Sequence, residues 1–391
     1  MSQGELPLRY GCNPHQSFAR VYHESGRLPF EVINGSPGYI NLLDALNSWQ
    51  LVRELKQVLE LPAATSFKHL SPAGAAVAVP LTEALKKAYF VDDLELSPLA
   101  TAYARARGAD PLSSFGDWIA LSDEVDVSTA RLISREVSDG IVAPAYQPAA
   151  LDILRKKKGG KYVVLQMDET YNPAKTEKRE VFGVVLEQSI NQTIITSDLL
   201  DNVVSQNTDI SPQARRDMLL ATIALKYTQS NSICLALDGQ VIGNGAGQQN
   251  RLACTDLAAG KAEAWHLRQH PEIMGLKFKK GLKRTEKINA IEAYLRGDMA
   301  GQERQLWEAN FESVPEAMTE EMRRGWIDQL QKVVLSSDAF IPFRDNIDRA
   351  ARTGVGYVVE TGGALRDDDV ITAANEYGMV LVLTGLRLFH H

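Results

Sequence analysis

The chain is organised around residues 65–77, Thr65-Ser66-Phe67-Lys68-His69-Leu70-Ser71-Pro72-Ala73-Gly74-Ala75-Ala76-Val77. An apolar run ends there in a basic pair, Lys68-His69. Ser71 is a favoured N-cap residue and Pro72 falls at the first helical position, so the pattern predicts a strand over 65–68 followed by a capped helix. The small residues around Gly74 allow a ligand or another backbone to approach closely.

The basic pair is therefore expected at the carboxyl end of a strand, beside a helix N-terminus. Open α/β sheets bind ligands at such places, and anionic groups are favoured there. A His with a pKa near neutrality, next to a Lys whose pKa burial can lower, suits a general base and a charge stabiliser. For this segment taken alone, a surface dipeptide ahead of an ordinary capped helix is the favoured interpretation.

Length and composition exclude several classes of protein. A chain of 391 residues is expected to form two or three domains, and 45% hydrophobic with 23% charged residues is typical of a globular protein. No apolar run has the length of a membrane span, and the three cysteines form no CxxC pair, so a reducing, cytoplasmic location is expected. A net charge of −7 argues against a nucleic-acid partner but leaves room for a phosphorylated small molecule.

Short apolar strands alternate with helical patterns along the chain, which indicates an α/β fold. The predicted helices are 41–60, 81–90, 99–107, 129–137, 148–157, 215–227, 254–268, 285–296, 303–311, 319–331, 346–352 and 367–377. The predicted strands are 65–68, 119–121, 141–145, 162–166, 181–186, 193–196, 233–237, 241–243, 276–280, 356–360 and 379–383. Because the second half repeats the alternation of the first, two similarly built domains are predicted, 1–190 and 191–391.

Other segments offer weaker signals. Arg9 and Tyr10 supply a guanidinium and a phenol that suit a phosphate. Residues 243–247 read GxGxG and lack the GxGxxG dinucleotide motif, yet a Gly-rich loop feeding a helix can approach a ligand, with Arg251 as a cation. The basic run 277–284 is either a solvated face or a site for a polyanionic tail. Zinc-hydrolase ligand sets, a GxSxG elbow and a phosphate-binding P-loop do not occur in the sequence.

Four segments together resemble one family. They are RYGCNPHQ (9–16), FKHLSPAGAAV (67–77), KYTQSNS with GQVIGNGAGQQNR (226–251), and SSDAFIPFRDNIDRA (336–350) with the terminal LRLFHH. The family is AICAR transformylase, the folate-dependent formyltransferase of late purine synthesis. Two departures from its pattern are Cys12, where Met is commoner, and Ile341, which replaces an aromatic residue.

The resemblance implies two tandem cytidine-deaminase-like α/β domains in three layers, and a homodimer with its active sites at the interface. The expected reaction moves a formyl group from 10-formyltetrahydrofolate to the 5-amino group of AICAR, without zinc. The IMP cyclohydrolase domain that precedes this module in the bifunctional protein has no counterpart before Arg9, so a stand-alone transformylase without cyclohydrolase activity is expected.

Roles follow from the same resemblance. His69 would act as general base, Lys68 would stabilise the oxyanion or the leaving N10, and Asn231 would orient the reacting groups. The AICAR-binding residues would be Arg9, Tyr10, Asn41, Phe115, Gly116, Asp139, Phe340, Asp345 and Arg387. The folate side would be lined by Arg251, Leu252, Asn289, Pro342 and Phe343. A potassium ion would lie near Ser230, Ser232, Asp338 and His390, although capping and terminal packing explain the last two equally well.

Two alternatives stay open at this point. The chain could use another formyl donor or a related amino-imidazole nucleotide, or it could be a non-catalytic AICAR-binding sensor. A sensor needs only the phosphate and base contacts, so the presence of Lys68, His69 and Asn231 together favours an enzyme.

Overall fold

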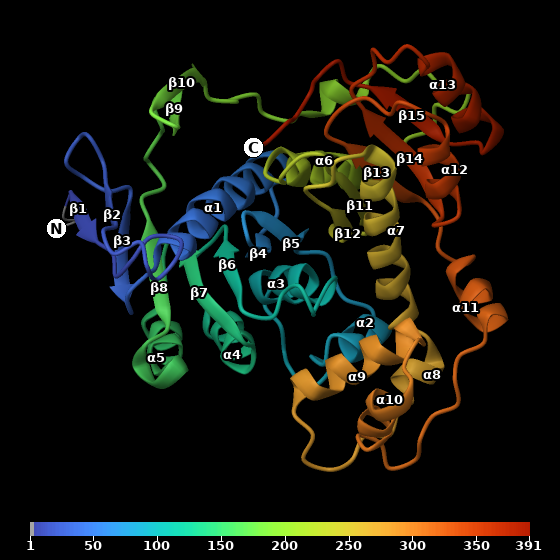
Figure 1. Ribbon diagram of the computed structural model, residues 1–391, viewed down its shortest axis with the longest axis horizontal. Coiled ribbons are helices and arrows are strands. Elements are labelled where there is room, and N and C mark those ends of the chain that lie inside the picture. Colours follow the sequence, from blue (N-terminus) through green and yellow to red (C-terminus); the bar gives the residue numbers. More distant parts are fainter. Residues whose placement is uncertain (1–3) are drawn as a thin grey trace.

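The computed structural model describes residues 4–391, in which one eleven-stranded mixed sheet forms the centre (Figure 1). In sheet order its strands are β15 (Val380–Leu383), β14 (Val355–Glu360), β13 (Val333–Ser337), β11 (Ile233–Leu237), β12 (Gln240–Gly245), β5 (Ser71–Val77), β4 (Ala63–Lys68), β6 (Asp117–Leu121), β7 (Ser138–Ala143), β8 (Val163–Met167) and β3 (Phe30–Asn34). The strands β1 (Glu5–Pro7) and β2 (Arg20–Tyr22), and β9 (Thr176–Val181) and β10 (Val184–Ser189), form two separate hairpins.

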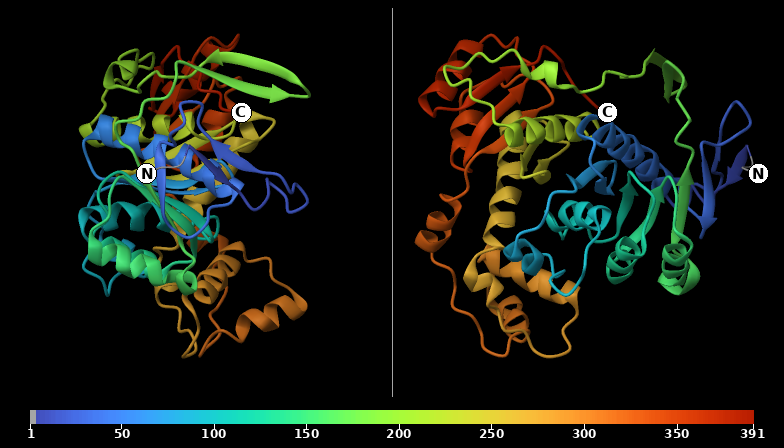
Figure 2. Two further views of the ribbon diagram at one scale, coloured as in Figure 1. Left: turned by 90° about the vertical axis from the view of Figure 1, so that its left-hand side faces the viewer. Right: turned by 180° about the vertical axis from the view of Figure 1, so that it is seen from behind.

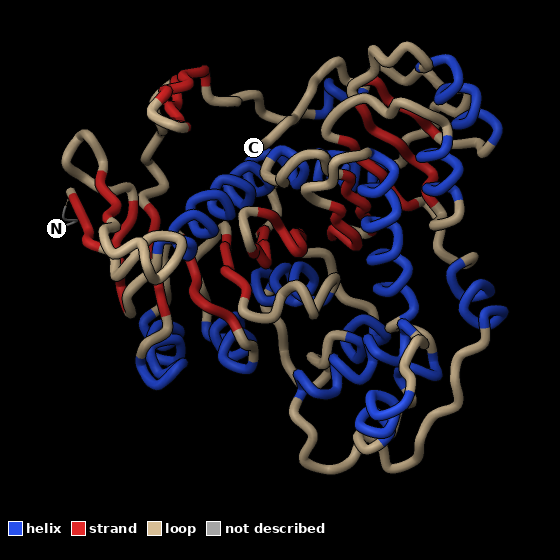
Figure 3. Tube along the Cα trace, in the orientation of Figure 1, coloured by secondary structure: helices blue, strands red, loops and turns tan. Residues whose placement is uncertain are grey.

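Helices cover both faces of the sheet, which gives three layers (Figure 3). One face packs against α1 (Tyr39–Leu59) and α6 (Pro212–Lys226). The other packs against α3 (Pro98–Gly108), α4 (Val127–Arg135), α5 (Pro148–Lys156), α7 (Arg251–Leu267), α12 (Asp345–Ala351) and α13 (Asp367–Glu376). The predicted three-layer α/β fold is confirmed. Among residues 4–391, no helix combines the length and the apolar character needed to cross a bilayer.

Four further helices form a third apolar cluster. They lie at the end of α7 and next to the first half (Figure 2). They are α8 (Pro271–Met274), α9 (Arg284–Arg296), α10 (Gly301–Glu308) and α11 (Glu320–Ile327), and they pack on the end of α7. The short helix α2 (Glu83–Ala88) follows β5.

The sheet has the same strand order on both sides of its centre. In the first half the hairpin β4–β5 is followed by the parallel strands β6, β7 and β8, and in the second half the hairpin β11–β12 is followed by β13, β14 and β15. The hairpins meet where β5 pairs with β12, through Gln240 and Ala76. We call this contact the seam. The order of elements matches the expectation of two similarly built halves, and the boundary at 190/191 stays a prediction.

The helix predicted after Ser71 is wrong, because these residues form strand β5. Lys68 pairs with Ser71, so His69 and Leu70 make a two-residue hairpin turn with φ of 52° and 63°. Ser71-Pro72 favours a helix start only through its own short-range geometry, whereas the strand is stabilised by long-range packing against α3. A Cβ on Gly74 would lie 2.0 Å from the carbonyl oxygen of Ala106, so glycine lets the strand and the helix backbones meet.

The Gly-rich run of the second half is used in the same way. Gly243 and Gly245 lie in β12, and a Cβ on either would lie 2.1–2.2 Å from a carbonyl oxygen of α7. The prediction that these glycines approach a ligand is therefore wrong for both of them.

Three further strand predictions need correction. Residues 181–186 do not form one strand, because Phe182-Gly183 turns the chain between β9 and β10. Residues 193–196 contain no strand, and 276–280 contribute only an isolated bridge from Phe278 to Phe311. The sequence reading also missed β13, whose VVLSS sequence is buried on both faces and so shows no alternation.

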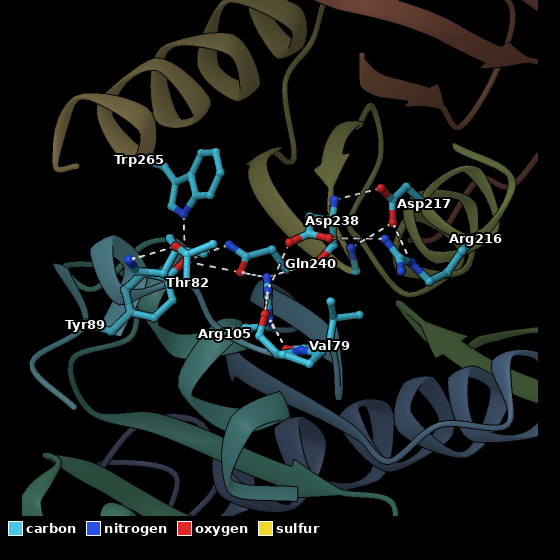
Figure 4. Close-up of polar contacts among 12 residues, drawn as sticks. Val79, Thr82, Tyr89, Arg105, Arg216, Asp217, Asp238, Gln240 and Trp265 are labelled. Atoms are coloured by element: carbon cyan, nitrogen blue, oxygen red, sulfur yellow. Dashed lines mark hydrogen bonds and ion pairs between the residues drawn. The ribbon is translucent and has the colours of Figure 1, made fainter. Parts of the chain in front are cut away.

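A buried guanidinium holds the seam together (Figure 4). Arg105, with 0% of its side chain exposed, donates to the carbonyl oxygens of Val79 at 2.7 Å and Pro80 at 2.7 Å in the first half. In the second half it donates to Asp238 O at 3.0 Å, Asp238 Oδ2 at 3.1 Å and Gln240 Oε1 at 2.8 Å. One side chain thus satisfies polar groups on both sides of the seam.

Arg105→Met should strongly destabilise the fold, because it leaves the acceptors at the seam without their donor. Breaking a buried charged network typically costs about 3–5 kcal/mol. Urea unfolding followed by circular dichroism measures this loss. The control is Arg135→Met, which removes an exposed pair with Asp93 and should change stability by less than about 1 kcal/mol. Equal effects of the two substitutions would contradict the assigned role of Arg105.

Candidate active site

The basic pair lies at the tip of the β4–β5 hairpin. Lys68 is half-buried and its Nζ donates to the carbonyl oxygen of Phe115 at 2.5 Å, whereas His69 is exposed in the turn. The carboxylate of Asp44, buried on α1, accepts the N–H of Leu70 at 2.8 Å through Oδ1. The turn therefore presents the imidazole to solvent while its backbone is anchored from below.

The loop that contacts Lys68 is itself held by buried charges. Arg107 donates to the carbonyl oxygen of Ser114 at 2.6 Å and pairs with Asp117 and Glu136, each at 2.8 Å. This leaves Phe115 48% exposed at the surface beside Lys68. An exposed aromatic ring on a rigid loop can stack on a planar ligand.

A second polar cluster gathers at the start of β11 and of α7. Arg251 donates to Asn231 Oδ1 at 3.1 Å and to the carbonyl oxygen of Ser232 at 3.1 Å, and it also pairs with Asp338. Asp338 in turn accepts the N–H of Ser232 at 3.0 Å. Arg251 is thus a buried, paired cation rather than the available one that the sequence suggested, and it fixes the side chain of Asn231.

The C-terminal residues close this second cluster. Ser230 and His390 exchange two hydrogen bonds of 3.0 Å, and Leu388 donates to the carbonyl oxygen of Asp338 at 2.8 Å. Burial lowers the pKa of the His390 imidazole, which favours its neutral form. Figure 1 shows the C-terminus returning to the middle of the molecule, near the ends of α1 and α6.

A groove of about 500 Å³ brings residues of both halves together. From the first half it is lined by Lys68, His69, Ser71, Pro72, Ala73 and Ser113, and from the second by Gln229, Asn244, Ala246, Gly247, Leu257 and Lys261. The halves are also tied here by hydrogen bonds, from Gln229 N to Ser71 Oγ at 3.2 Å and from Asn244 Nδ2 to Pro72 O at 2.8 Å. The basic pair Lys68-His69 therefore opens onto a groove that neither half builds alone.

Sequence reasoning missed three polar residues of this groove. Gln229 lies inside the KYTQSNS segment, which was the only available signal for it. Asn244 lies between two glycines of β12, and its buried Oδ1 accepts no hydrogen bond within the described residues. Lys261 lies on α7 in a helix of ordinary composition and pairs with Asp110 at 3.0 Å.

The other predicted binding residues are distributed more widely. Asn41 accepts the N–H of Gly38 at the start of α1, and the exposed Asp139 pairs with Lys158 at 2.7 Å. Gly116 adopts a φ of 75° after Phe115. The remaining predicted residues lie on the loop after β13 (Phe340, Pro342, Phe343), at the start of α12 (Asp345), on α7 (Leu252) and on α9 (Asn289).

Three residues predicted for the nucleotide make no polar contact with either cluster among the described residues. Arg9 and Arg387 are exposed and Tyr10 is half-buried. In the part of the chain from 4 to 391, no hydrogen bond or ion pair joins any of them to the groups around Lys68 or Asn231. Their proposed role in phosphate binding stays a prediction.

A buried acid supports the loop that carries Phe340 and Phe343. Glu360, 1% exposed at the end of β14, accepts the N–H of Ile341 at 2.7 Å through Oε2. Its Oε1 has no hydrogen-bond partner among the described residues. Burial raises the pKa of the Glu360 carboxyl to about 7, so the group is largely neutral in the folded chain below that pH.

This raised pKa predicts a pH dependence of stability. Between pH 4.5 and about 7, Glu360 holds a proton in the folded state that it releases in the unfolded state. The contribution of this group to the free energy of unfolding is therefore full below pH 4.5 and is lost as the pH rises through 7. The loss amounts to up to about 3 kcal/mol. Glu360→Gln stays neutral, so urea unfolding at pH 5 and pH 8 should show the loss in the wild type and not in the variant.

The exposed Glu376 provides a matched control for this measurement. Glu376→Gln should follow the wild-type pH profile of stability. Parallel profiles for the wild type and Glu360→Gln would show that Glu360 is ionised in the fold.

Comparison with known proteins shows which family the chain belongs to. Residues 2–261 match the family described as "AICARFT/IMPCHase bienzyme". The chain is 31% identical over 392 residues to the "Bifunctional purine biosynthesis protein PurH" of Xanthomonas campestris pv. campestris (strain 8004), with 99% of this chain and 58% of that protein covered. It is 30% identical over 387 residues to the protein of the same name from Elusimicrobium minutum (strain Pei191), with 98% and 58% covered. The chain spans less than two thirds of the length of these relatives. The match over 2–261 shows that it belongs to the AICARFT/IMPCHase family.

Proposed function

We propose that the chain transfers a formyl group from 10-formyltetrahydrofolate to the 5-amino group of AICAR. The observation that carries this proposal is the position of Lys68 and His69 on a fixed turn that opens onto the groove shared by both halves. The family match and the PurH names of the relatives support a role in purine biosynthesis.

The residues suit each step of such a transfer. The amine of AICAR is conjugated with its imidazole ring and is a weak nucleophile, so His69 would take its proton as nitrogen attacks the formyl carbon. Lys68, whose Nζ already contacts a carbonyl oxygen, would stabilise the negative oxygen of the tetrahedral intermediate. The bond from carbon to N10 then breaks and N10 takes a proton, which yields formyl-AICAR and tetrahydrofolate. Asn231, oriented by Arg251, would hold the reacting groups.

The two substrates would occupy different sides of the turn. Arg9, Tyr10 and Arg387 would bind the nucleotide phosphate, and Asn41, Phe115, Gly116, Asp139, Phe340 and Asp345 the AICAR base. Arg251, Leu252, Asn289, Pro342 and Phe343 would line the folate side. The exposed rings of Phe115 and Phe343 support this division, since both substrates contain planar rings.

A potassium ion would lie in the second cluster. Ser232 Oγ is fully buried and has no hydrogen-bond partner in the described part of the chain, and it lies next to Asp338. Ser230, Ser232, Asp338 and His390 would hold the ion, which would supply positive charge that rigidifies the corner around Asn231. In residues 4–391, no group of three or more His, Cys, Asp or Glu side chains is arranged to hold a metal ion.

The working form would be a homodimer. The β9–β10 hairpin stands away from the body of the chain (Figure 2), and every residue of both strands is exposed. A two-stranded hairpin is marginally stable alone in water. Val181, Val184 and Leu186 share one of its faces and are 50–60% exposed. We infer that a second copy of the chain covers this apolar face.

The first experiment measures turnover of the purified chain with AICAR and 10-formyltetrahydrofolate, following tetrahydrofolate and formyl-AICAR, with IMP assayed in parallel. Formyl-AICAR is the expected product, without IMP. His69→Ala should lower kcat by about 10²–10⁴-fold, the usual loss for a missing general base, with little change in AICAR affinity.

The control is His23→Ala, which removes an imidazole that contacts Ser25 and Tyr171 outside both clusters, and which should leave kcat unchanged. Turnover of His69→Ala near the wild-type rate would overturn the assignment of the base. AICAR binding without turnover would point first to another formyl donor, tested with a donor panel, and then to a sensor.

Charges on the apolar face of the hairpin should dissociate the dimer. Val184→Lys with Leu186→Lys places two charges on this face, and light scattering after gel filtration should report a mass near 43.1 kDa instead of twice that value. Val185 points to the opposite face, so Val185→Lys should stay dimeric. A wild-type chain that is monomeric, or a doubly substituted chain that stays dimeric, would contradict the interface.

A further inference from the structure

The two halves contain equivalent hairpin turns with different residues. The β4–β5 turn is His69-Leu70, with φ of 52° and 63°, and the β11–β12 turn is Asp238-Gly239, with φ of 51° and 77°. Asp-Gly is a favoured sequence for such a turn, because both residues tolerate positive φ. His-Leu is less favoured, because a bulky residue such as Leu70 is strained at positive φ, although His tolerates it better than most residues. The turn of the first half therefore needs an outside support.

Both turns rest on a buried aspartate of the helix beneath them. Asp217 on α6 accepts the N–H of Asp238 at 2.7 Å and of Gly239 at 2.8 Å, as Figure 4 shows for this corner of the seam. Asp44 on α1 accepts the N–H of Leu70 at 2.8 Å. The two carboxylates are 3% and 6% exposed. The support is thus repeated in both halves, although only the first turn carries a catalytic pair.

The first turn has fewer supports than the second. The Asp238-Gly239 turn also receives the guanidinium of Arg105, which donates to Asp238 O at 3.0 Å. Among the described residues, the only side-chain hydrogen bond to the backbone of His69 or Leu70 comes from Asp44. Burial raises the pKa of Asp44, while the Leu70 N–H and the nearby His69 oppose the rise. The carboxylate is therefore held in a position where burial disfavours its charge, beneath the turn that carries His69.

We propose that Asp44 is the positioning residue for His69: its carboxylate holds the strained His69-Leu70 turn so that the imidazole stays aimed at the substrate amine. The proposal rests on the proposed formyl transfer. Asp44 touches no reacting atom and acts through the Leu70 N–H. Small displacements of a catalytic group reduce the rate steeply, so loss of this contact should appear in kcat rather than in substrate binding.

The test compares four proteins. Asp44→Ala should lower kcat by about 10–100-fold with KM for AICAR nearly unchanged, because the turn relaxes while the binding residues stay in place. Asp44→Asn keeps a carbonyl oxygen that can accept the Leu70 N–H and should regain most of the rate. Asp217→Ala removes the matching support from a turn that holds no catalytic group and that keeps its bond to Arg105. It should lower stability but leave kcat close to the wild-type value.

Hydrogen exchange measured by mass spectrometry on peptides spanning 67–72 tests the hydrogen bond between Asp44 and the Leu70 N–H independently of enzyme activity. Exchange in these peptides should accelerate in Asp44→Ala and not in Asp217→Ala. Unchanged exchange in Asp44→Ala would overturn the contact, and faster exchange with unchanged kcat would overturn the positioning role. An inactive wild type would refute the formyl transfer instead, and the exchange result would then decide separately whether Asp44 orders the turn.

Discussion

The arrangement of the site depends on the buried guanidinium of Arg105 at the seam between β5 and β12. The two strands share one registered pair, Gln240 with Ala76, so strand pairing alone gives the halves little to hold them in register. Arg105 binds backbone oxygens on both sides, at Val79, Pro80 and Asp238, and has no contact with solvent. Because Lys68 and His69 belong to one half and Asn231 to the other, this contact and the hydrogen bonds of Gln229 and Asn244 together fix how these groups face one another.

Repetition of one structural unit explains how the site is divided. Each half has a hairpin whose second strand packs a glycine against a helix backbone, Gly74 on α3 and Gly245 on α7, and whose turn rests on a buried aspartate. In the second half the turn, Asp238-Gly239, lies at the seam and is bound by Arg105. In the first half it faces the groove and carries the basic pair. The same structural unit therefore forms a joint between the halves in one case and supports the basic pair at the groove in the other.

The sequence predicted those elements whose stability is local. The helices α1 and α6 have long apolar stripes with capping signals, and both were predicted within a few residues of their ends. Strand β5 was not, because Ser71-Pro72 is a strong local helix signal that sheet pairing and the close approach of α3 override. The pairing of Arg251 with Asp338 was also invisible, since the partners are 87 positions apart and neither lies in a pattern that demands a partner. The family resemblance named Asn231 and the basic pair, but it could not show that Asp44 and Asn244 lie beside them.

The distribution of exposed residues bears on whether one chain completes the site. The groove gathers Lys68 and His69 with Gln229 and Asn244, whereas Arg9 and Arg387 are exposed and do not line it. A nucleotide phosphate needs converging cations, and isolated exposed arginines bind it weakly because solvent screens each one. The apolar face of the β9–β10 hairpin is a surface of the kind that a partner normally covers. Both observations fit the proposed homodimer, in which a second copy would bury the hairpin and complete the substrate contacts.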